Sequence, residues 1–256
     1  MRRFILAAVA AVALAPAVVR AWTVPDETLK YQINYKWGFI DANAGVATVT
    51  AENLPGTGTF RATLTGRSVE LLGHEYVGGD TIVGTLMADT VRSVMTQHLS
   101  YSAGDFEIET ITYPQGSAKD GEIVKRLPDG KVVCSRISHY GGGLTVDLLG
   151  VYYYMRQIDY SQMQPGQSVT VNVFSGKNPE TLSVTYNGKV MADSCGMQTE
   201  AFNVSLDFST PAPGNSSDHL EAWISTAPDR VPVRVTGTLK FGKMDCRLLA
   251  VEAVKP

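Results

Sequence analysis

Residues 29–39 read LKYQINYKWGF, a segment in which apolar residues alternate with polar residues or glycine over eleven positions. Successive side chains of an extended strand point to opposite sides, so a period of two gives the strand two chemically different faces. One face of this segment is therefore apolar, and the other is polar and faces solvent. The apolar set is Leu29, Tyr31, Ile33, Tyr35, Trp37 and Phe39.

The same alternation continues along the chain in both halves. AGVATVTAENL follows the turn-like DAN at 41–43, and the next alternating run follows PGTG at 55–58. The sequence therefore predicts a mostly β protein, a large curved antiparallel sheet or half-open barrel built as a meander. Further strands are expected around residues 80–87, 92–102, 105–113, 121–127 and 131–138, and after residue 167 around 167–176, 180–192, 197–208, 218–226, 230–240 and 244–254.

One segment breaks the β pattern. Between residues 141 and 160 the sequence is GGGLTVDLLGVYYYMRQIDY, in which apolar residues recur at steps of three and four. Thr145 or Asp147 can cap a helix at its N-terminus, and the Pro-Gly turn in MQPGQ follows it. We therefore expect one helix near residues 147–158, packed against the sheet. Tyr152, Tyr153 and Tyr154 then either line a ligand pocket or pack the helix onto the sheet.

The N-terminus is typical of an export signal. Arg2 and Arg3 precede the apolar run FILAAVAAVALAPAVV, and Val19, Arg20 and Ala21 form a cleavage site, so the mature chain is expected to begin at Trp22. The alternative is a permanent N-terminal anchor, but Pro16 interrupts the run and a membrane span needs about 20 apolar residues. We expect residues 1–21 to be a signal peptide and residues 22–256 a single β-rich domain, exported to the periplasm of a Gram-negative bacterium.

The charge of the mature chain bears on its partners. Removing residues 1–21 takes away three arginines and no acidic residue, which changes the formal net charge from −3 to −6. A nucleic-acid partner would require clustered lysine and arginine, so none is expected. No later apolar run is long enough to cross a bilayer as a helix, so the mature chain is expected to have no transmembrane span.

Three cysteines, Cys134, Cys195 and Cys246, cannot all pair within one chain. Either one intramolecular disulfide forms or all three are free thiols. In an up-and-down meander, Cys195 and Cys246 begin the first and fourth of the last strands at opposite ends. That separation exceeds the ~5.5 Å between Cα atoms that a disulfide requires, so we expect this pair not to be linked.

Residues 227–242, APDRVPVRVTGTLKFG, can supply an acid and a base on an active-site loop or form a hairpin corner. Val231, Val233 and Val235 alternate with polar residues after a Pro-Asp turn, which favours the corner. Arg234 is then expected on a face that meets solvent or a carboxylate.

Motifs that would indicate chemistry are few. Glu107 and Glu109 lie on one face of a strand, the arrangement of paired glycosidase carboxylates, but a solvated strand face explains them as well. The four histidines are isolated in sequence, and no nucleophile elbow, phosphate-binding loop or dinucleotide fingerprint is present. We therefore expect no catalytic residues, no metal site and no cofactor.

Several phrases together resemble domain-of-unknown-function family 3108 of Gram-negative envelope proteins. The resemblance implies an exported, strand-rich protein of no established activity, and it supplies no catalytic residues to carry over. The phrases are YQINYKWGFIDANAGVATVT at 31–50, DLLGVYYYMRQIDYSQMQPGQ at 147–167, VTYNGK at 184–189 and AWISTAPDRVPVRVTGTLKFG at 222–242.

Two classes of function follow from this sequence. In the first, a non-enzymatic envelope protein binds a lipid, an acyl chain or a lipoprotein against the concave face of the sheet, because one helix is too narrow to cover ten or more strands. In the second, the protein is a structural or interaction module that contacts an envelope protein; an enzyme is a third possibility. The ligand-binding residues predicted for the first class are Tyr31, Tyr35, Trp37, Tyr152, Val233 and Val235.

Overall fold

The computed structural model describes residues 23–38, 40–68, 80–102, 105–113, 120–139, 143–176, 178–209, 220–238 and 242–253. Within these ranges the chain forms one sheet of fifteen strands around a single α-helix, followed by a short 3-10 turn, η1 (Tyr160–Gln162). The predicted fold class, a large curved antiparallel sheet with one helix, is confirmed. The predicted signal peptide at residues 1–21 lies outside the described residues.

The strands before the helix are β1 (Glu27–Trp37), β2 (Ile40–Leu54), β3 (Thr59–Ser68), β4 (Thr81–Met87), β5 (Ser93–Ser102), β6 (Asp105–Thr112), β7 (Asp120–Arg126), β8 (Val132–His139) and β9 (Thr145–Val146). The helix is α1 (Leu148–Gln157). The later strands are β10 (Ser168–Phe174), β11 (Pro179–Ser194), β12 (Met197–Ser209), β13 (Leu220–Ser225), β14 (Pro232–Thr238) and β15 (Lys243–Ala253).

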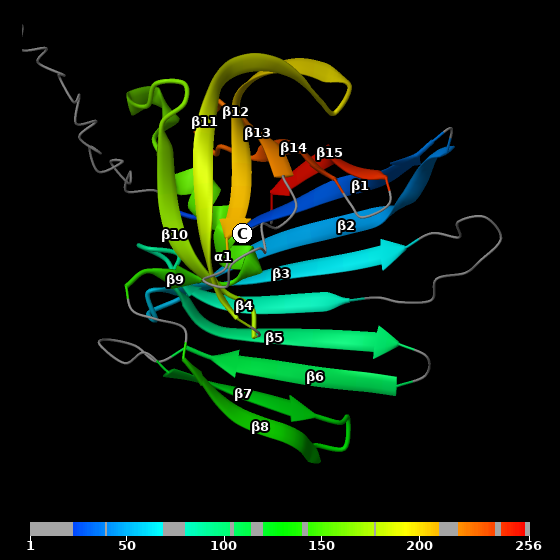
Figure 1. The fold of residues 1–256 in the computed structure, drawn as a ribbon, viewed down its shortest axis with the longest axis vertical. Coiled ribbons are helices and arrows are strands. Elements are labelled where there is room, and N and C mark those ends of the chain that lie inside the picture. Colours follow the sequence, from blue (N-terminus) through cyan, green and yellow to red (C-terminus); the bar gives the residue numbers. More distant parts are fainter. Residues whose placement is uncertain are drawn as a thin grey trace, which may run out of the picture.

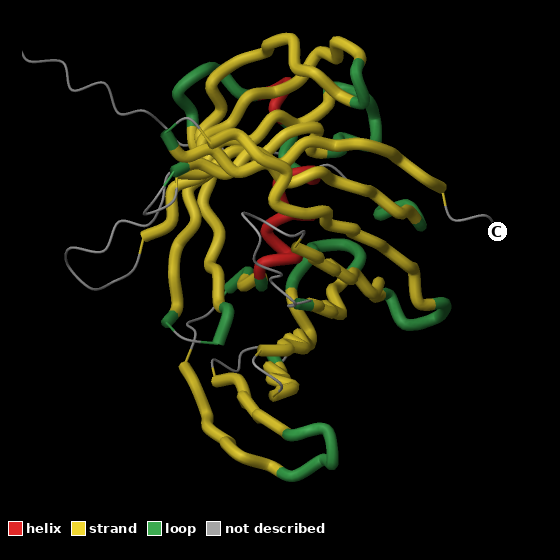
Figure 2. Tube along the Cα trace, turned by 90° about the vertical axis from the view of Figure 1, so that its right-hand side faces the viewer, coloured by secondary structure: helices red, strands yellow, loops and turns green. Residues whose placement is uncertain are grey.

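The first and last strands meet in the middle of the sheet. Its order is β8-β7-β6-β5-β4-β3-β2-β1-β15-β14-β13-β12-β11-β10-β9, and every neighbouring pair is antiparallel except β9 with β10. Two meanders, β1 to β8 and β10 to β15, are therefore joined edge to edge through β1 and β15. The sheet curls so that its inner face surrounds α1 without closing into a barrel (Figures 1 and 2).

The long β11–β12 hairpin bends over this curled sheet. At its tip, the backbone N–H of Cys195 donates to the carbonyl of Leu248 on β15, with N and O 3.4 Å apart. The hairpin arches across the top of the molecule in Figure 1.

Helix α1 begins where the sequence predicts. Asp147 is its N-cap: one carboxylate oxygen accepts the N–H of Gly150 at 2.6 Å, and the other accepts the hydroxyl of Thr96. The Asp147 N–H donates to Ser93 Oγ at 2.8 Å, which fixes the helix start on β5. Burial raises the pKa of the Asp147 carboxyl. Gly150 has no side chain to separate the helix from Val146.

The helix covers only part of the inner face. Its main neighbours in the sheet are β3, β4, β9 and β10. Its buried side chains join one large apolar core, and Tyr153 packs edge-on against Phe60 with ring centroids 5.0 Å apart. Among the described residues no helix has the length and apolar character to span a bilayer.

A second, smaller core packs the end of β10 against β6 and β7. It consists of Ile111, Tyr113, Ile123 and Phe174, and the Tyr113 hydroxyl donates to the Phe174 carbonyl at 2.7 Å. The turn after β10 therefore rests on the inner face of β6 and β7.

The three cysteines are free. The absence of a Cys195–Cys246 bond agrees with the prediction, but the reasoning behind it is wrong. The bend of the β11–β12 hairpin carries Cys195 to Leu248, two residues from Cys246 on the same strand. Alternation in sequence reveals strands but does not reveal how far a long hairpin curls.

Candidate functional site

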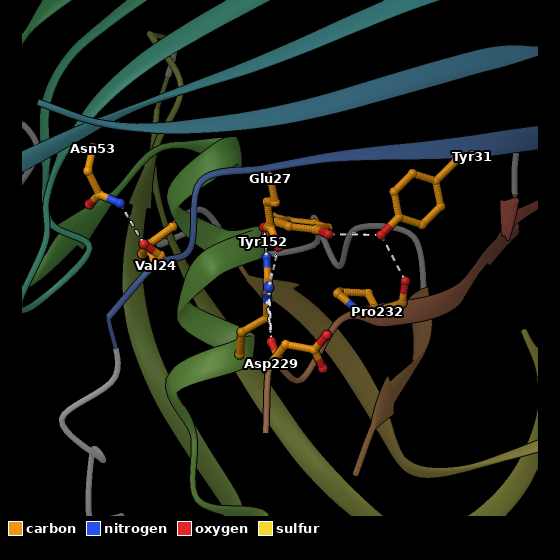
Figure 3. Close-up of polar contacts among 8 residues, drawn as sticks. Val24, Glu27, Tyr31, Asn53, Tyr152, Asp229 and Pro232 are labelled. Atoms are coloured by element: carbon orange, nitrogen blue, oxygen red, sulfur yellow. Dashed lines mark hydrogen bonds and ion pairs between the residues drawn. The ribbon is translucent and has the colours of Figure 1, made fainter. Parts of the chain in front are cut away.

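A buried ion pair ties the helix to the first strand and to the β13–β14 turn. The guanidinium of Arg156 on α1 donates to both carboxylate oxygens of Glu27 on β1, with 3.0 Å between Nη2 and Oε2. Its Nε and Nη2 also donate to the carbonyl of Asp229, at 3.1 and 2.9 Å. The Arg156 side chain is 0% exposed and that of Glu27 is 5% exposed. Figure 3 shows Glu27 and Asp229 at this junction.

The surroundings of Arg156 keep it charged. Burial acts to lower its pKa, but the neighbouring Tyr152 and the hydrogen-bonded Glu27 carboxylate act in the other direction, so the net shift of the Arg156 pKa is upward. The guanidinium also lies over the rings of Tyr152 and Tyr153, 5.6 and 5.4 Å from their centroids. Two of the three consecutive tyrosines, Tyr153 and Tyr154, are buried, and Tyr152 is half-buried.

Tyr31 and Tyr152 meet through their hydroxyl groups in this same region. Their oxygen atoms are 2.8 Å apart, and the Tyr31 hydroxyl donates to the carbonyl of Pro232 at 2.8 Å (Figure 3). Burial raises the pKa of both phenols, so both stay neutral. The contact connects β1, α1 and the start of β14.

Residues 226–231 form the predicted hairpin corner between β13 and β14, and this corner also holds the helix end. Arg230, with a φ of +48°, donates to the carbonyl of Ile158 and pairs with Asp159, at 3.1 Å between Nη2 and Oδ1. A hydrogen bond from Ser161, together with Arg230, lowers the pKa of Asp159. Arg234 meets a carboxylate, as expected: Asp245 accepts its Nε and Nη2 at 2.8 and 2.9 Å.

The structure separates the predicted ligand-binding residues into two groups. Tyr31, Tyr152 and Val233 lie together in or beside the packed core, where Tyr31 and Val233 are 5% and 2% exposed. Tyr35 and Val235 lie further along the same strands and are half-buried. Trp37 ends β1, and its side chain lies outside the described residues.

Strand register extends the second group into a larger apolar surface. One paired row runs Ile33, Cys246, Val235, Ala222 and Val204, and the next runs Tyr35, Met244, Gly237, Leu220 and Leu206. Both rows start in the core, where Ala222, Val204 and Leu206 are at most 2% exposed. Toward β1 they become half-buried. We call the half-buried apolar members the inner-face patch: Ile33, Tyr35, Leu220, Val235 and Met244.

A free thiol lies within this patch. Cys246 pairs with Ile33 on one side and with Val235 on the other. Burial, and to a lesser extent Asp245, raises the pKa of the Cys246 thiol to about 11. The Cys246 thiol is therefore expected to react slowly at ordinary pH, and its position makes its rate of alkylation a reporter of access to the patch.

The paired glutamates of β6 share one lysine. Lys125 on β7 lies 3.5 Å from a carboxylate oxygen of Glu107 and 3.7 Å from one of Glu109. Within the described ranges, no group of three or more histidine, cysteine or acidic side chains is arranged to hold a metal ion.

Sequence reasoning missed Glu27, Arg156 and Arg230, which organise the region around the helix. The sequence did contain one signal for this buried ion pair. Arg156 lies four residues after Tyr152, on the side of the helix that is expected to be buried. A charged residue at such a position indicates a buried partner, although the sequence does not say which one.

Comparison with known proteins places this chain in a family without a known activity. Residues 30–247 match the model of a protein of unknown function, DUF3108. No curated protein matches the sequence. The structure is similar to a β-barrel-like protein of the domain of unknown function DUF1849 from Brucella abortus, with a TM-score of 0.63 and 9% identity over 92% of this chain and 100% of that one. This likeness shows the fold alone.

A second solved structure is a putative exported protein with a YmcC-like fold from Bacteroides fragilis. It is 9% identical, covers 91% of this chain and 100% of its own, and has a TM-score of 0.33.

Proposed function

This chain belongs to the DUF3108 family of proteins of unknown function, and we propose that it is an exported envelope protein that binds the apolar chain of a lipid or acylated protein. The proposed site is the inner-face patch. Export to the periplasm is supported by the basic start, the apolar run and the Val19-Arg20-Ala21 site at the N-terminus. The proposal assigns binding, and no reaction, to this protein.

One observation carries the proposal: two apolar rows of the inner face run from the core toward β1 and become half-buried there. The helix packs mainly on β3, β4, β9 and β10, and its Tyr152 reaches β1 at Tyr31, two residues before the patch begins at Ile33. Contiguous apolar surface on the concave side of a protein is typical of a ligand-binding face. Gly237 lets the Leu220 side chain lie across the patch, because a Cβ at 237 would come within 2.5 Å of Leu220 Cδ2.

The energetics favour a long, unbranched ligand. Each CH₂ group removed from water contributes about 0.8 kcal/mol, so a chain of ten buried methylene groups gains about 8 kcal/mol before the costs of association. Such binding requires no polar recognition. The buried Tyr31–Tyr152 contact, over which the Arg156 guanidinium lies, adjoins the patch two residues before Ile33 on β1.

A fluorescent fatty acid tests the proposal. We expect saturable binding with micromolar affinity or better, and at least ten-fold weaker binding in Val235→Asp and in Tyr35→Asp. Val133→Asp is the matched control, because Val133 is an apolar strand residue that is 48% exposed on β8. Circular dichroism and urea unfolding establish that each variant is folded. Equal affinity in all four proteins, or no binding, would contradict the proposal.

A specific observation supports a second candidate, an interaction module. The edge strand β8 exposes Val132, Val133 and Ile137 at 46%, 48% and 69%, and no described strand pairs with its outer edge. Exposed edges with apolar side chains pair readily with strands of other chains. If this function is the correct one, chemical cross-linking to an envelope partner is lost in Val133→Asp and is retained in Val235→Asp.

A further inference from the structure

A separate cleft opens at the other end of the helix layer, away from the inner-face patch. It has a volume of about 310 Å³ and lies where the turn between β4 and β5 meets the segment that leads into β9. It shares no residue with the patch. Its lining consists of Met87, Asp89, Thr90, Arg92, Gly143 and Leu144.

Arg92 is the one cation among the described residues of this lining. Its Nε is buried and has no acceptor within the described residues, and Arg92 forms no ion pair there. By contrast, Arg156, Arg230 and Arg234 each hold a carboxylate. The guanidinium charge of Arg92 is therefore not neutralised by a described carboxylate, which favours an anionic group in the cleft.

The turn that carries Arg92 has an unusual backbone. Val91 has a φ of +52° and is 0% exposed. A β-branched residue is a genuine outlier in this region, because its branched side chain crowds the backbone. The turn is held by the hydrogen bond from the Val91 N–H to the Met87 carbonyl, at 2.9 Å, and by the burial of Val91 in the main core. Strained positions of this kind cluster at binding sites, and this one fixes the residue before Arg92.

We propose that this cleft binds an oxyanion, the carboxylate or phosphate group of a small molecule, through the guanidinium of Arg92. The planar fork of arginine matches two oxygens of either group. Asp89 is the one acidic side chain among the described lining residues; it is exposed and accepts the Thr90 hydroxyl at 3.0 Å, so solvent screens its charge. The site is independent of the proposed acyl-chain patch.

The test follows the Arg92 Nε–Hε resonance by proton–nitrogen NMR. Inorganic phosphate and sodium acetate are titrated separately into the full-length mature protein, with sodium chloride at matched ionic strength as the reference. The Arg92→Gln variant assigns the resonance. Arg126→Gln is the matched control, because Arg126 is an exposed arginine at the end of β7.

We expect a saturable shift with phosphate, acetate or both, and the two titrations identify which oxyanion is preferred. In backbone amide spectra, affinity should fall at least ten-fold in Arg92→Gln, fall partly in Arg92→Lys, and stay unchanged in Arg126→Gln. A shift that is linear with all three salts, or an equal loss in the two Gln variants, overturns the proposal. Fatty-acid binding should be unaffected by Arg92→Gln, so failure of this inference is distinguishable from failure of the proposed function.

Discussion

The Glu27–Arg156 ion pair makes the sharpest prediction about stability. Glu27→Gln keeps the size of the side chain and removes its charge, which leaves the guanidinium of Arg156 buried without a counter-charge. Breaking one side of a buried pair costs about 3–5 kcal/mol, a large part of the roughly 5–15 kcal/mol that stabilises a typical domain. Urea unfolding at pH 7, followed by circular dichroism, measures the loss.

Two further variants show whether the loss of stability comes from the burial of the ion pair or from the loss of a charge alone. Lys30 and Glu252 pair at 2.7 Å but are 48% and 54% exposed, so Glu252→Gln should cost at most about 1 kcal/mol. The double variant Glu27→Leu with Arg156→Met should be more stable than Glu27→Gln alone, because no unpaired charge remains. If Glu27→Gln and Glu252→Gln cost the same, the account of this junction is wrong.

Three other predictions concern the helix, the outer face and the thiols. Gly150→Ala should destabilise the protein by about 1–3 kcal/mol in urea although alanine favours helices, because the new Cβ would lie 2.7 Å from Val146 Cβ; unchanged stability would contradict the close packing. Burial acts to raise the pKa of Asp245, but Arg234 and Arg247 outweigh it and the pKa is lowered. The wild type should therefore lose stability as pH falls below about 3.9, and Asp245→Asn should lose less over the same range; parallel curves would refute this. Iodoacetamide should alkylate exposed Cys134 and Cys195 faster than Cys246 in a mass-spectrometric time course, and the same rate at all three would refute the burial of Cys246.

The strands and the helix could be predicted because their signals are local. Alternation at 29–39 and three-to-four spacing at 147–158 depend only on the period of side chains along each element. Asp147 as N-cap and the corner at 226–231 follow from short-range backbone chemistry as well.

The pairing of β1 with β15 could not be predicted, because it joins the two ends of the described chain and no turn connects them. The curl that brings Cys195 to Leu248 depends on twist accumulated along two long strands. Alternation also made Tyr31 and Tyr35 equivalent, whereas Tyr31 is buried against Tyr152 and Pro232 and Tyr35 is half-buried. Alternation identifies the face of a strand but not what covers it.

Protection of Cys246 tests the central claim most directly, because this thiol lies between Ile33 and Val235 in the proposed site. The measurement is the rate of alkylation of each cysteine with and without dodecanoate below its critical micelle concentration, read by peptide mass spectrometry. We predict that dodecanoate slows alkylation of Cys246 at least five-fold in a saturable manner and leaves the rate at Cys134 on β8 unchanged. An unchanged rate at Cys246, or equal slowing at both cysteines, would contradict acyl-chain binding on the inner face.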